Sequence, residues 1–407
     1  MFLNLGEPLD YVDPWRTGYE ARVRQLCARS RRIAYFHEYP NPSTFRYRAF
    51  NPGLTLAANP DYDVSAAWFD LHDLARDDGF VEEADALVIC RTRYDAAVAH
   101  MISRARASGI PVLFDCDDLV FDIDRLHLLV DALNQNQRDE GIWNWWAAYI
   151  GRMSMVMRLC DALVTTNAFL ADRAAEWRPQ MRIAIVPNYL NPNQQRYSES
   201  LYEAKRKSGW ARDGRIHVGY FSGSPSHDRD FAVAAPAICR LMEADSRVML
   251  RVVGNLEPGQ DLLRFGDRVD FIPLQDFMNL QRYIAEVEIN IAPLQDNVFT
   301  NCKSELKFFE AAICGTLTLA SPTFTFRNAI EHGRTGFLVA PHDWDDALRK
   351  AVEVVDDPDH YQTFAERAFA QAQARYGFDK HADATLRAVF GSEAPISAVG
   401  NTCEASV

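Results

Sequence analysis

The chain has 407 residues, of which 48% are hydrophobic and 24% charged, and this length and composition favour two globular domains of about 200 residues each. The net charge of −13 excludes a general nucleic-acid-binding protein, because such proteins present a basic surface. The N-terminus lacks the basic region and the long apolar core of a signal peptide, and no apolar stretch is long enough to span a membrane. The eight cysteines form no CxxC pair. We therefore expect a cytoplasmic protein with reduced thiols and no structural zinc.

The first half alternates short apolar runs with longer amphipathic segments. A helix is expected over residues 94–107. The apolar runs that read as buried strands cover residues 32–36, 86–90, 111–115, 162–165 and 182–186. Short apolar strands separated by helices predict an α/β domain with a parallel sheet that helices cover on both faces.

Three carboxylates, those of Asp115, Asp117 and Asp118, come at the end of the predicted strand 111–115. Like charges this close repel one another unless they bind something, so the triplet is a candidate site. Asp115-Cys116-Asp117 also fits the D-x-D pattern that binds Mg²⁺ or Mn²⁺ in other enzymes, although so short a pattern is common by chance. A purely structural role, with Asp118 capping a helix, is the third interpretation.

Two further clusters in the first half have a structural and a functional interpretation. The arginine-rich segment 22–32 could touch an anionic membrane surface from the inside of the cell, or form one solvated helix face. Trp143, Trp145 and Trp146 lie at helical spacing, for which we favour core packing over stacking on a sugar.

The polar stretch 188–215 is the expected interdomain linker, and it predicts domains at residues 1–200 and 201–380, with a C-terminal helix and a frayed tail at 381–407. After it the pattern of strands and helices restarts. Helices are expected over residues 231–244 and 279–286. Strands are expected over residues 217–221, 248–253, 269–273, 289–292 and 316–322.

Residues 303–315 form the most informative segment of the chain. Ser304 is a suitable N-cap for a helix with an apolar face, and Gly315 stands where a C-terminal glycine belongs. Lys307 and Glu310 lie one turn apart on this helix, so a cation and a carboxylate share one side. Since a helix N-terminus binds anions and a carboxylate can accept hydrogen bonds from a sugar diol, this arrangement suits a diphosphate joined to a ribose.

The residues around this helix resemble the C-terminal domain of GT-B glycosyltransferases, especially the large family-4 group. The resemblance rests on the order and spacing of several runs. It covers residues 155–378 well and the first 150 residues only loosely. The runs are EAAICG at 310–315, LAS at 319–321, GRTGFLV at 333–339, DALVTTN at 161–167 and VPN at 186–188. It implies the GT-B architecture, two Rossmann-like domains facing each other across a cleft, with the C-terminal helix packing back on the first domain.

The resemblance also implies roles for individual residues in the second domain. Glu310 matches the second Glu of the E-x7-E motif, which holds the ribose, whereas Cys302 replaces the first Glu. Gly223 begins the G-R-x-x-x-x-K-G motif that grips the donor diphosphate, with Ser224 at the Arg position and Arg229 at the Lys position. Arg229 therefore keeps one cation, and Lys307 is expected to supply the other. A surface Arg229 paired with Asp228 or Asp230 is the structural alternative.

The backbone N–H groups of Glu305 and Leu306, following Ser304, take the positions that meet the phosphate in this family, and the Glu305 side chain could reach the sugar. In the first domain, Asp117 aligns with the family's His at the sugar-transfer centre. Arg46 and Arg48, in the loop that follows the first strand, could face an anionic acceptor, and packing of that loop's aromatic residues is nearly as well supported.

The implied function is transfer of a sugar from a nucleotide sugar to a saccharide or lipid-linked saccharide acceptor. The resemblance further implies retention of anomeric configuration, a role in surface polysaccharide or glycoconjugate synthesis, and no metal cofactor. Because Ser224 and Cys302 depart from the family pattern, two alternatives stay open: a non-catalytic nucleotide-binding subunit and a GT-B nucleotide-sugar epimerase.

Overall fold

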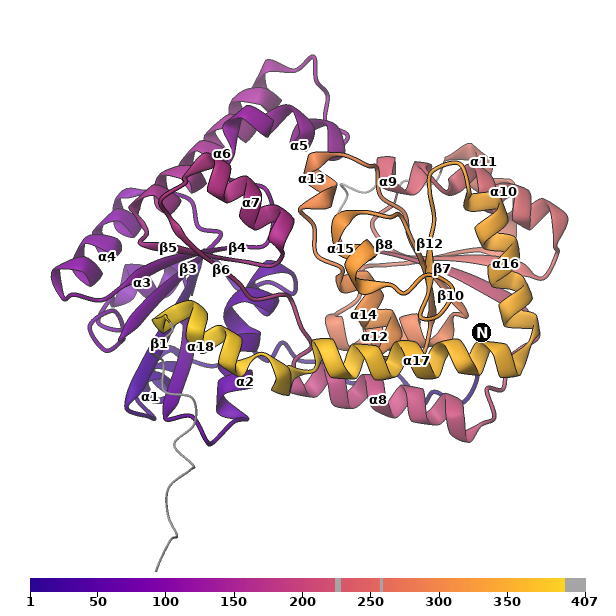
Figure 1. Ribbon diagram of the computed structural model, residues 1–407, viewed down its shortest axis with the longest axis horizontal. Coiled ribbons are helices and arrows are strands. Elements are labelled where there is room, and N and C mark those ends of the chain that lie inside the picture. Colours follow the sequence, from indigo (N-terminus) through magenta and orange to yellow (C-terminus); the bar gives the residue numbers. More distant parts are fainter. Residues whose placement is uncertain (224–227, 257–258, 392–407) are drawn as a thin grey trace, which may run out of the picture. The chain divides into compact units, whose positions relative to one another are not determined.

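A computed structural model of the chain describes residues 1–223, 228–256 and 259–391 (Figure 1). It divides into two compact units, each built around one six-stranded parallel sheet. The first unit comprises residues 13–121, 151–192 and the chain from Phe378 onward, and the second comprises residues 1–12, 122–150 and 193–377. The predicted α/β fold with two Rossmann-like domains is thus confirmed. The single boundary expected near residue 200 does not describe residues 1–12 and 122–150, which belong to the second unit.

The first sheet has the strand order β2-β1-β3-β4-β5-β6, and every neighbouring pair is parallel. Its strands are β1 (Arg31–His37), β2 (Val64–Phe69), β3 (Ala86–Cys90), β4 (Val112–Cys116), β5 (Ala162–Thr165) and β6 (Arg182–Ile185). All five predicted strands are present. The sequence analysis missed β2, because Ser65, Ala66 and Ala67 give it little of the β-branched signal although all six residues are buried.

Three helices of the first unit begin at a residue whose side chain caps the helix. In α4, for example, the Asp95 side chain accepts a hydrogen bond from the Val98 N–H, and Arg104 and Arg106 lie in the last turn. The helices are α1 (Tyr19–Leu26), a π-helical turn (Arg46–Phe50), α2 (Asn51–Ala57), α3 (Leu71–Arg76), α4 (Ala96–Ala107), α7 (Ala168–Trp177) and α18 (Ala382–Phe390).

Helix α18 lies against the first sheet, at the C-terminal end of the described chain (Figure 1). The Arg182 side chain of β6 donates a hydrogen bond to the Ala388 carbonyl at 2.8 Å, and the Arg31 guanidinium lies over the Phe390 ring at 3.9 Å. The Tyr189 ring stacks on His381 at 4.6 Å, just before this helix. The tail expected to fray lies outside the described residues, except for Gly391 at its start.

The second sheet has the order β9-β8-β7-β10-β11-β12, also parallel throughout. This is the order of a doubly wound dinucleotide-binding fold, in which the chain direction across the sheet reverses between the first and fourth strands. The strands are β7 (Ile216–Ser222), β8 (Val248–Gly254), β9 (Val269–Ile272), β10 (Ile289–Ala292), β11 (Leu317–Ala320) and β12 (Phe337–Leu338). The reversal therefore falls between β7 and β10, and ligands of such sheets bind beyond the carboxyl ends of those strands.

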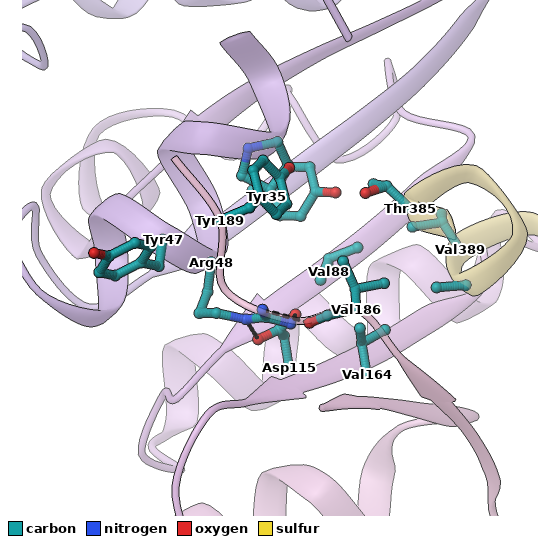
Figure 2. Close-up of a pocket in the computed structure, with 12 residues that line it drawn as sticks. Tyr35, Tyr47, Arg48, Val88, Asp115, Val164, Val186, Tyr189, Thr385 and Val389 are labelled. Atoms are coloured by element: carbon teal, nitrogen blue, oxygen red, sulfur yellow. Dashed lines mark hydrogen bonds and ion pairs between the residues drawn. The ribbon is translucent and has the colours of Figure 1, made fainter. Parts of the chain in front are cut away.

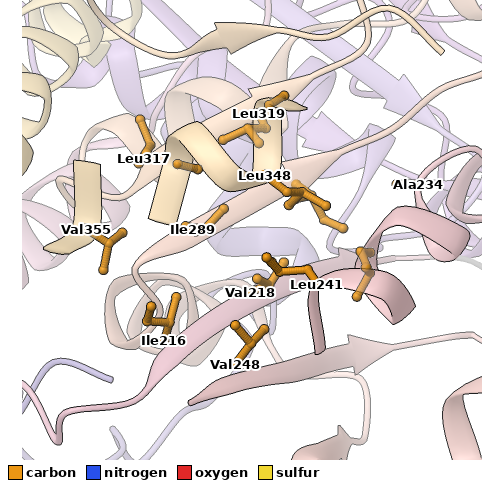
Figure 3. Close-up of a cluster of buried hydrophobic side chains, with 14 of the residues drawn as sticks. Ile216, Val218, Ala234, Leu241, Val248, Ile289, Leu317, Leu319, Leu348 and Val355 are labelled. Carbon is orange, nitrogen blue, oxygen red and sulfur yellow. The ribbon is translucent and has the colours of Figure 1, made fainter. Parts of the chain in front are cut away.

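Aliphatic side chains of the second sheet and its helices form one continuous core (Figure 3). Val218 and Ile289 from adjacent strands and Leu348 from α16 are fully buried in it. The helices of this unit are α5 (Leu126–Ala132), α8 (Pro192–Lys207), α9 (Asp228–Ala232), α10 (Ala235–Ala244), α11 (Gln260–Leu263), α12 (Phe277–Glu286), α13 (Val298–Asn301), α14 (Leu306–Ala312), α15 (Phe324–Ala329), α16 (Trp344–Asp356) and α17 (Pro358–Tyr376). Helix α6 (Glu140–Leu159) runs from the second unit into the first.

Two predicted elements of the second half differ from the structure. The helix expected over 231–244 is divided into α9 and α10, and Pro236 occupies the first turn of α10, where a proline is tolerated. The stretch 188–215, expected as a linker, contains α8. Its polar composition was misleading because the buried face of α8 is hydrogen-bonded: Ser198 Oγ donates to Gln281 Oε1 at 2.9 Å, and Lys205 Nζ donates to Thr316 Oγ1 at 3.0 Å.

Across residues 1–223, 228–256 and 259–391, no helix combines the length and the apolar character that crossing a membrane requires.

Candidate functional site

The carboxyl ends of β7 and β10 bring together the residues predicted to bind a diphosphate. Gly223 directly follows β7, and Arg229 lies in α9, the next helix along the chain. Lys307 and Glu310 lie in α14, which follows β10 and α13. These four residues thus come from the two connections that flank the reversal of the sheet. Ser224, the remaining predicted residue of this set, lies outside the described residues.

Lys307 is the most unusual charged residue at this edge. Its Nζ is buried, and within the described part of the chain it has no hydrogen-bond partner; it lies 4.7 Å from the centre of the Tyr220 ring. Burial lowers the pKa of Lys307 from 10.5 to about 8, although the charge of Asp230 partly opposes this shift. A buried ammonium group that makes no hydrogen bond costs free energy, and a bound anion would remove that cost.

Other polar side-chain atoms at this edge are also buried without partners among the described residues. They are Ser304 Oγ in the loop before α14, Thr323 Oγ1 after β11 and Gln295 Oε1 after β10. Native proteins leave few buried polar atoms unsatisfied, so their concentration at one sheet edge indicates a site that is completed by a ligand or by water.

Glu310 is buried, with 3% of its surface exposed, and its Oε1 accepts a hydrogen bond from Gln194 Nε2 at 3.0 Å. Gln194 is itself fully buried in α8. Glu310 is therefore not an exposed carboxylate on the surface of the helix. The contact fixes the carboxylate on the side of α14 that faces α8, while its predicted role towards a ribose stays a prediction.

The start of α14 differs by one residue from the prediction. Glu305 rather than Ser304 is the N-cap residue, and its side chain makes no capping bond. The Glu305 carboxylate is buried instead, because it accepts a hydrogen bond from Tyr376 Oη of α17 at 2.9 Å, and burial raises its pKa. The Glu305 side chain therefore holds α14 on α17 and does not reach for a sugar. At the start of α14, the backbone N–H groups of Glu305 and Leu306 are the remaining candidates for contact with the phosphate. Gly315, after the helix, has the predicted left-handed backbone, with φ +63°.

Arg229 is half-exposed and paired with residues from the segment 122–150, while the side chain of Asp228, one of its two expected partners, lies outside the described part of the structure. Its Nη1 forms an ion pair with Asp131 of α5, and its Nε donates to Asn134 Oδ1 at 3.0 Å. Asp230, which the structural alternative offered as a partner, instead accepts a hydrogen bond from the Gln295 N–H at 3.0 Å. The cation that is expected to grip phosphate thus contacts a carboxylate from the segment 122–150.

At the carboxyl edge of the first sheet, Asp115 is neutralised by Arg48 (Figure 2). The pair is bidentate, with Arg48 Nε at 2.7 Å from Asp115 Oδ1 and Nη2 at 2.9 Å from Oδ2, and both side chains are almost completely buried. Arg48 Nη1 also donates to the Val186 carbonyl at 2.8 Å. Separating such a buried pair costs about 3–5 kcal/mol. The expectation that Arg48 faces an anionic acceptor is therefore wrong, because the residue clamps the π-helical turn to β4.

Asp117 binds a different arginine. Arg91 Nη1 lies 3.1 Å from Asp117 Oδ1, and Thr44 Oγ1 donates to Asp117 Oδ2 at 3.2 Å. Arg91, directly after β3, has a left-handed backbone with φ +36°, a costly conformation for a residue with a side chain. The two carboxylates of the D-x-D pattern thus bind separate arginines instead of converging on one point. Asp118 is not the N-cap residue of a described helix; its Oδ1 accepts a hydrogen bond from the Leu119 N–H at 3.1 Å.

The other basic and aromatic candidates of the first half also have structural contacts. Arg46 is buried and donates from Nε to the Pro42 carbonyl at 2.8 Å, so packing of the loop is the correct interpretation. Arg22 is buried against Asp73, which removes it from any membrane surface and from any solvated helix face. Trp145 is 52% exposed and stacks on Tyr149 at 5.3 Å, so core packing is wrong for this residue.

The sequence analysis missed Arg91, Thr44 and Gln194. Arg91 directly follows the predicted strand 86–90, so the rule that identified the carboxylates after the strand at 111–115 could have found it. Thr44 and Gln194 carry no comparable signal, because they act through partners that are distant in the sequence: Asp117 and Glu310 respectively.

Comparison with known proteins agrees with this geometry. The family profile described as glycosyl transferases group 1 matches residues 216–357. A D-inositol 3-phosphate glycosyltransferase of Thermobispora bispora is 26% identical over 239 residues, which are 55% of this chain and 54% of that protein. One of the same name from Streptomyces scabiei is 26% identical over 281 residues, 65% of this chain and 61% of that protein. The chain thus spans about half the length of the curated relatives it matches.

Solved structures with the same architecture cover most of the chain. Anabaena Alr3699/HepE in complex with UDP and glucose superposes with a TM-score of 0.55 at 15% identity, covering 88% of this chain and 99% of that one. WaaG, a glycosyltransferase involved in lipopolysaccharide biosynthesis, has a TM-score of 0.54 at 14% identity and covers 88% of this chain and 100% of its own. The chain therefore has the GT-B fold, and its residues 216–357 are similar to the group 1 glycosyl transferases.

Proposed function

We propose that this protein transfers a sugar from a nucleoside diphosphate donor to a saccharide or lipid-linked saccharide acceptor. The observation that carries the proposal is the buried Lys307 ammonium group, which finds no hydrogen-bond acceptor among the described residues at the carboxyl edge of the second sheet. A diphosphate supplies both the negative charge and the acceptor oxygens that this group lacks.

Three features would act together on the donor. Lys307 and Arg229 carry positive charge, and the N–H groups at the start of α14 have no acceptor within the helix. Together they would stabilise the negative charge that develops on the departing diphosphate. Glu310 would accept hydrogen bonds from the ribose hydroxyls. On this proposal catalysis consists mainly of positioning and of electrostatic stabilisation, and no metal is required.

The first sheet would supply the acceptor side. Asp117 is held by Arg91 and Thr44 at the end of β4, and on this proposal it acts on the transferred sugar or the acceptor hydroxyl. We propose that the reaction retains the anomeric configuration, with attack from the face that the diphosphate leaves and with a donor phosphate oxygen receiving the acceptor proton.

The similar proteins guide the choice of substrates. The curated relatives are named as D-inositol 3-phosphate glycosyltransferases, and the Anabaena structure holds UDP and glucose. UDP-sugars are therefore the first donors to test, with phosphorylated polyols and saccharides as acceptors. A role in glycoconjugate or surface polysaccharide synthesis is the corresponding pathway proposal.

A thermal-shift screen with UDP, GDP, dTDP and ADP tests the proposal first, because a ligand that binds the folded state raises its melting temperature. The matching nucleoside diphosphate should raise the Tm more than its nucleoside does, and release of that diphosphate from the sugar donor should depend on the acceptor. If no nucleoside diphosphate raises the Tm, the proposal fails. Binding without turnover would favour the non-catalytic subunit, and donor conversion without acceptor would favour the epimerase.

A further inference from the structure

Segment 122–150 lies over the proposed donor site, although it precedes the second sheet by more than sixty residues in the sequence. Contact between α5 and α13 places this segment beside the connection that follows β10 (Figure 1). The Arg229 contacts place it beside α9, after β7. The segment thus touches both connections that flank the point where a ligand of this sheet would bind.

The segment occupies hydrogen-bond donors of Arg229 for which a phosphate would compete. Asp131 offers a carboxylate oxygen to Arg229 Nη1, and Asn134 offers its amide oxygen to Nε at 3.0 Å. The two acceptors engage the guanidinium from two sides, so a phosphate bound through the Nε–Nη2 pair would replace Asn134, and one bound through the Nη1–Nη2 pair would compete with Asp131.

Asp131 is the acceptor whose position carries a local cost. It lies in the last turn of α5, where the helix dipole disfavours a negative charge, and Gln137 Nε2 donates a hydrogen bond to its Oδ1 at 2.9 Å. Asn134 is placed by the end of α5 itself, because its left-handed backbone, with φ +51°, closes a Schellman motif in which the next N–H donates to the Val130 carbonyl at 3.1 Å. The Arg229 contact offsets the cost at Asp131.

We propose that Asp131 and Asn134 form a latch that holds Arg229 in the unliganded protein and that the donor diphosphate displaces it. The proposal rests on the proposed function, because it requires a diphosphate to reach Arg229. When the diphosphate binds, Arg229 exchanges one set of oxygen acceptors for another, and the segment 122–150 is released from α9. The latch therefore lowers donor affinity by the free energy of the Arg229 contact.

Titration with UDP by calorimetry tests the latch. Asp131→Asn keeps the shape of the side chain but removes its charge, and Asn134→Gly removes the side chain while permitting the left-handed backbone. Each should bind UDP about two- to fivefold more tightly than the unmodified protein, as expected for the loss of a partly exposed ion pair or hydrogen bond. Asp124→Ala is the matched control, because this exposed residue removes the same charge from the same segment, and it should leave UDP affinity unchanged.

A double variant assigns the effect to Arg229. Arg229→Ala should weaken UDP binding, and adding Asp131→Asn to it should give no recovery, because the latch then has nothing to hold. Unchanged or weaker UDP binding by Asp131→Asn, in a protein that does lose affinity with Arg229→Ala, would overturn the latch and leave the proposed function intact. An equal gain from Asp124→Ala would also overturn it, in favour of a general effect of charge. Absence of binding of UDP, GDP, dTDP and ADP in every variant would overturn both proposals.

Discussion

Replacing Lys307 by methionine should stabilise the protein and at the same time weaken diphosphate binding. The two effects have one cause: the buried ammonium group of the unliganded protein is desolvated, and no described residue accepts a hydrogen bond from it. Methionine has a similar length and no charge, so it fills the same space beside Tyr220 without the desolvation cost.

The magnitude follows from the pKa of Lys307, which falls from 10.5 to about 8 in the folded protein. One pKa unit corresponds to about 1.4 kcal/mol, so burying the charge lowers the free energy of unfolding by about 3 kcal/mol at neutral pH. Since the folded pKa is the lower one, the unfolded chain binds more protons between pH 8 and pH 10.5. The free energy of unfolding should therefore rise with pH across this window, and that gain should be lost as the pH falls through 8.

Differential scanning fluorimetry with and without UDP measures both effects. The Tm of Lys307→Met should rise at pH 7 by about 2–4 °C for each kcal/mol gained. The UDP affinity should fall about ten- to a hundredfold, because a charge-assisted hydrogen bond to phosphate contributes about 1.5–3 kcal/mol. Lys350→Met, on an exposed turn of α16, is the control and should change neither quantity. A lower Tm combined with unchanged UDP affinity would refute both the cost assigned to the buried charge and the phosphate role.

Four further outcomes are expected. Glu310→Gln keeps the acceptor for Gln194 but removes the charge, and the preference for UDP over 2′-deoxy-UDP should largely disappear; an unchanged preference in calorimetry would contradict the ribose role. Asp117→Asn should lower kcat with little change in UDP affinity, and steady-state kinetics that show only a raised donor KM would place Asp117 on the donor instead. Sugar transfer should survive EDTA, and activity that returns only with Mg²⁺ or Mn²⁺ would revive the D-x-D interpretation. Burial lowers the pKa of Lys205 to about 7, so the free energy of unfolding should rise as the pH rises from 7 towards 10.5. Chemical denaturation at several pH values should show a smaller rise for Lys205→Met than for the unmodified protein.

The strands and the α14 segment could be predicted because their signals are local. Runs such as Ala86–Cys90 and Ile289–Ala292 are continuous apolar segments, and a strand buried on both faces needs that composition wherever it lies in the fold. Gly315 gave an equally local signal, since its left-handed backbone would be strained for any residue with a side chain. Helix α8 was missed for the opposite reason: its buried face uses hydrogen bonds from Ser198 and Lys205, which in the sequence look like solvent-exposed residues.

The partners of the charged residues could not be predicted, because they depend on the tertiary fold. Arg48 and Asp115 are 67 positions apart, and Arg229 and Asp131 are 98 positions apart. Arg48, Asp115 and Arg229 were singled out as charges that need an explanation, whereas Asp131 was not. Nothing in the sequence links either residue of a pair to the other. A charged residue that is buried with a partner of opposite charge has a structural role. Once the partner is known, such a residue is therefore interpreted as part of a structural ion pair and no longer as a candidate contact to a ligand.

The carboxyl edges of the two sheets differ in how their charges are balanced, and this difference assigns their ligands. On the first sheet Asp115 is matched by Arg48, and Asp117 by Arg91 and Thr44, so the charges of these two carboxylates are already balanced. On the second sheet, the buried Lys307 Nζ donates no hydrogen bond to any described residue, and Arg229 has a half-exposed ion pair with Asp131. Desolvation makes an unmatched buried charge costly, whereas a partly exposed ion pair is weak and easily exchanged. The anion should therefore bind at the second sheet, and the balanced edge of the first suits an uncharged hydroxyl group.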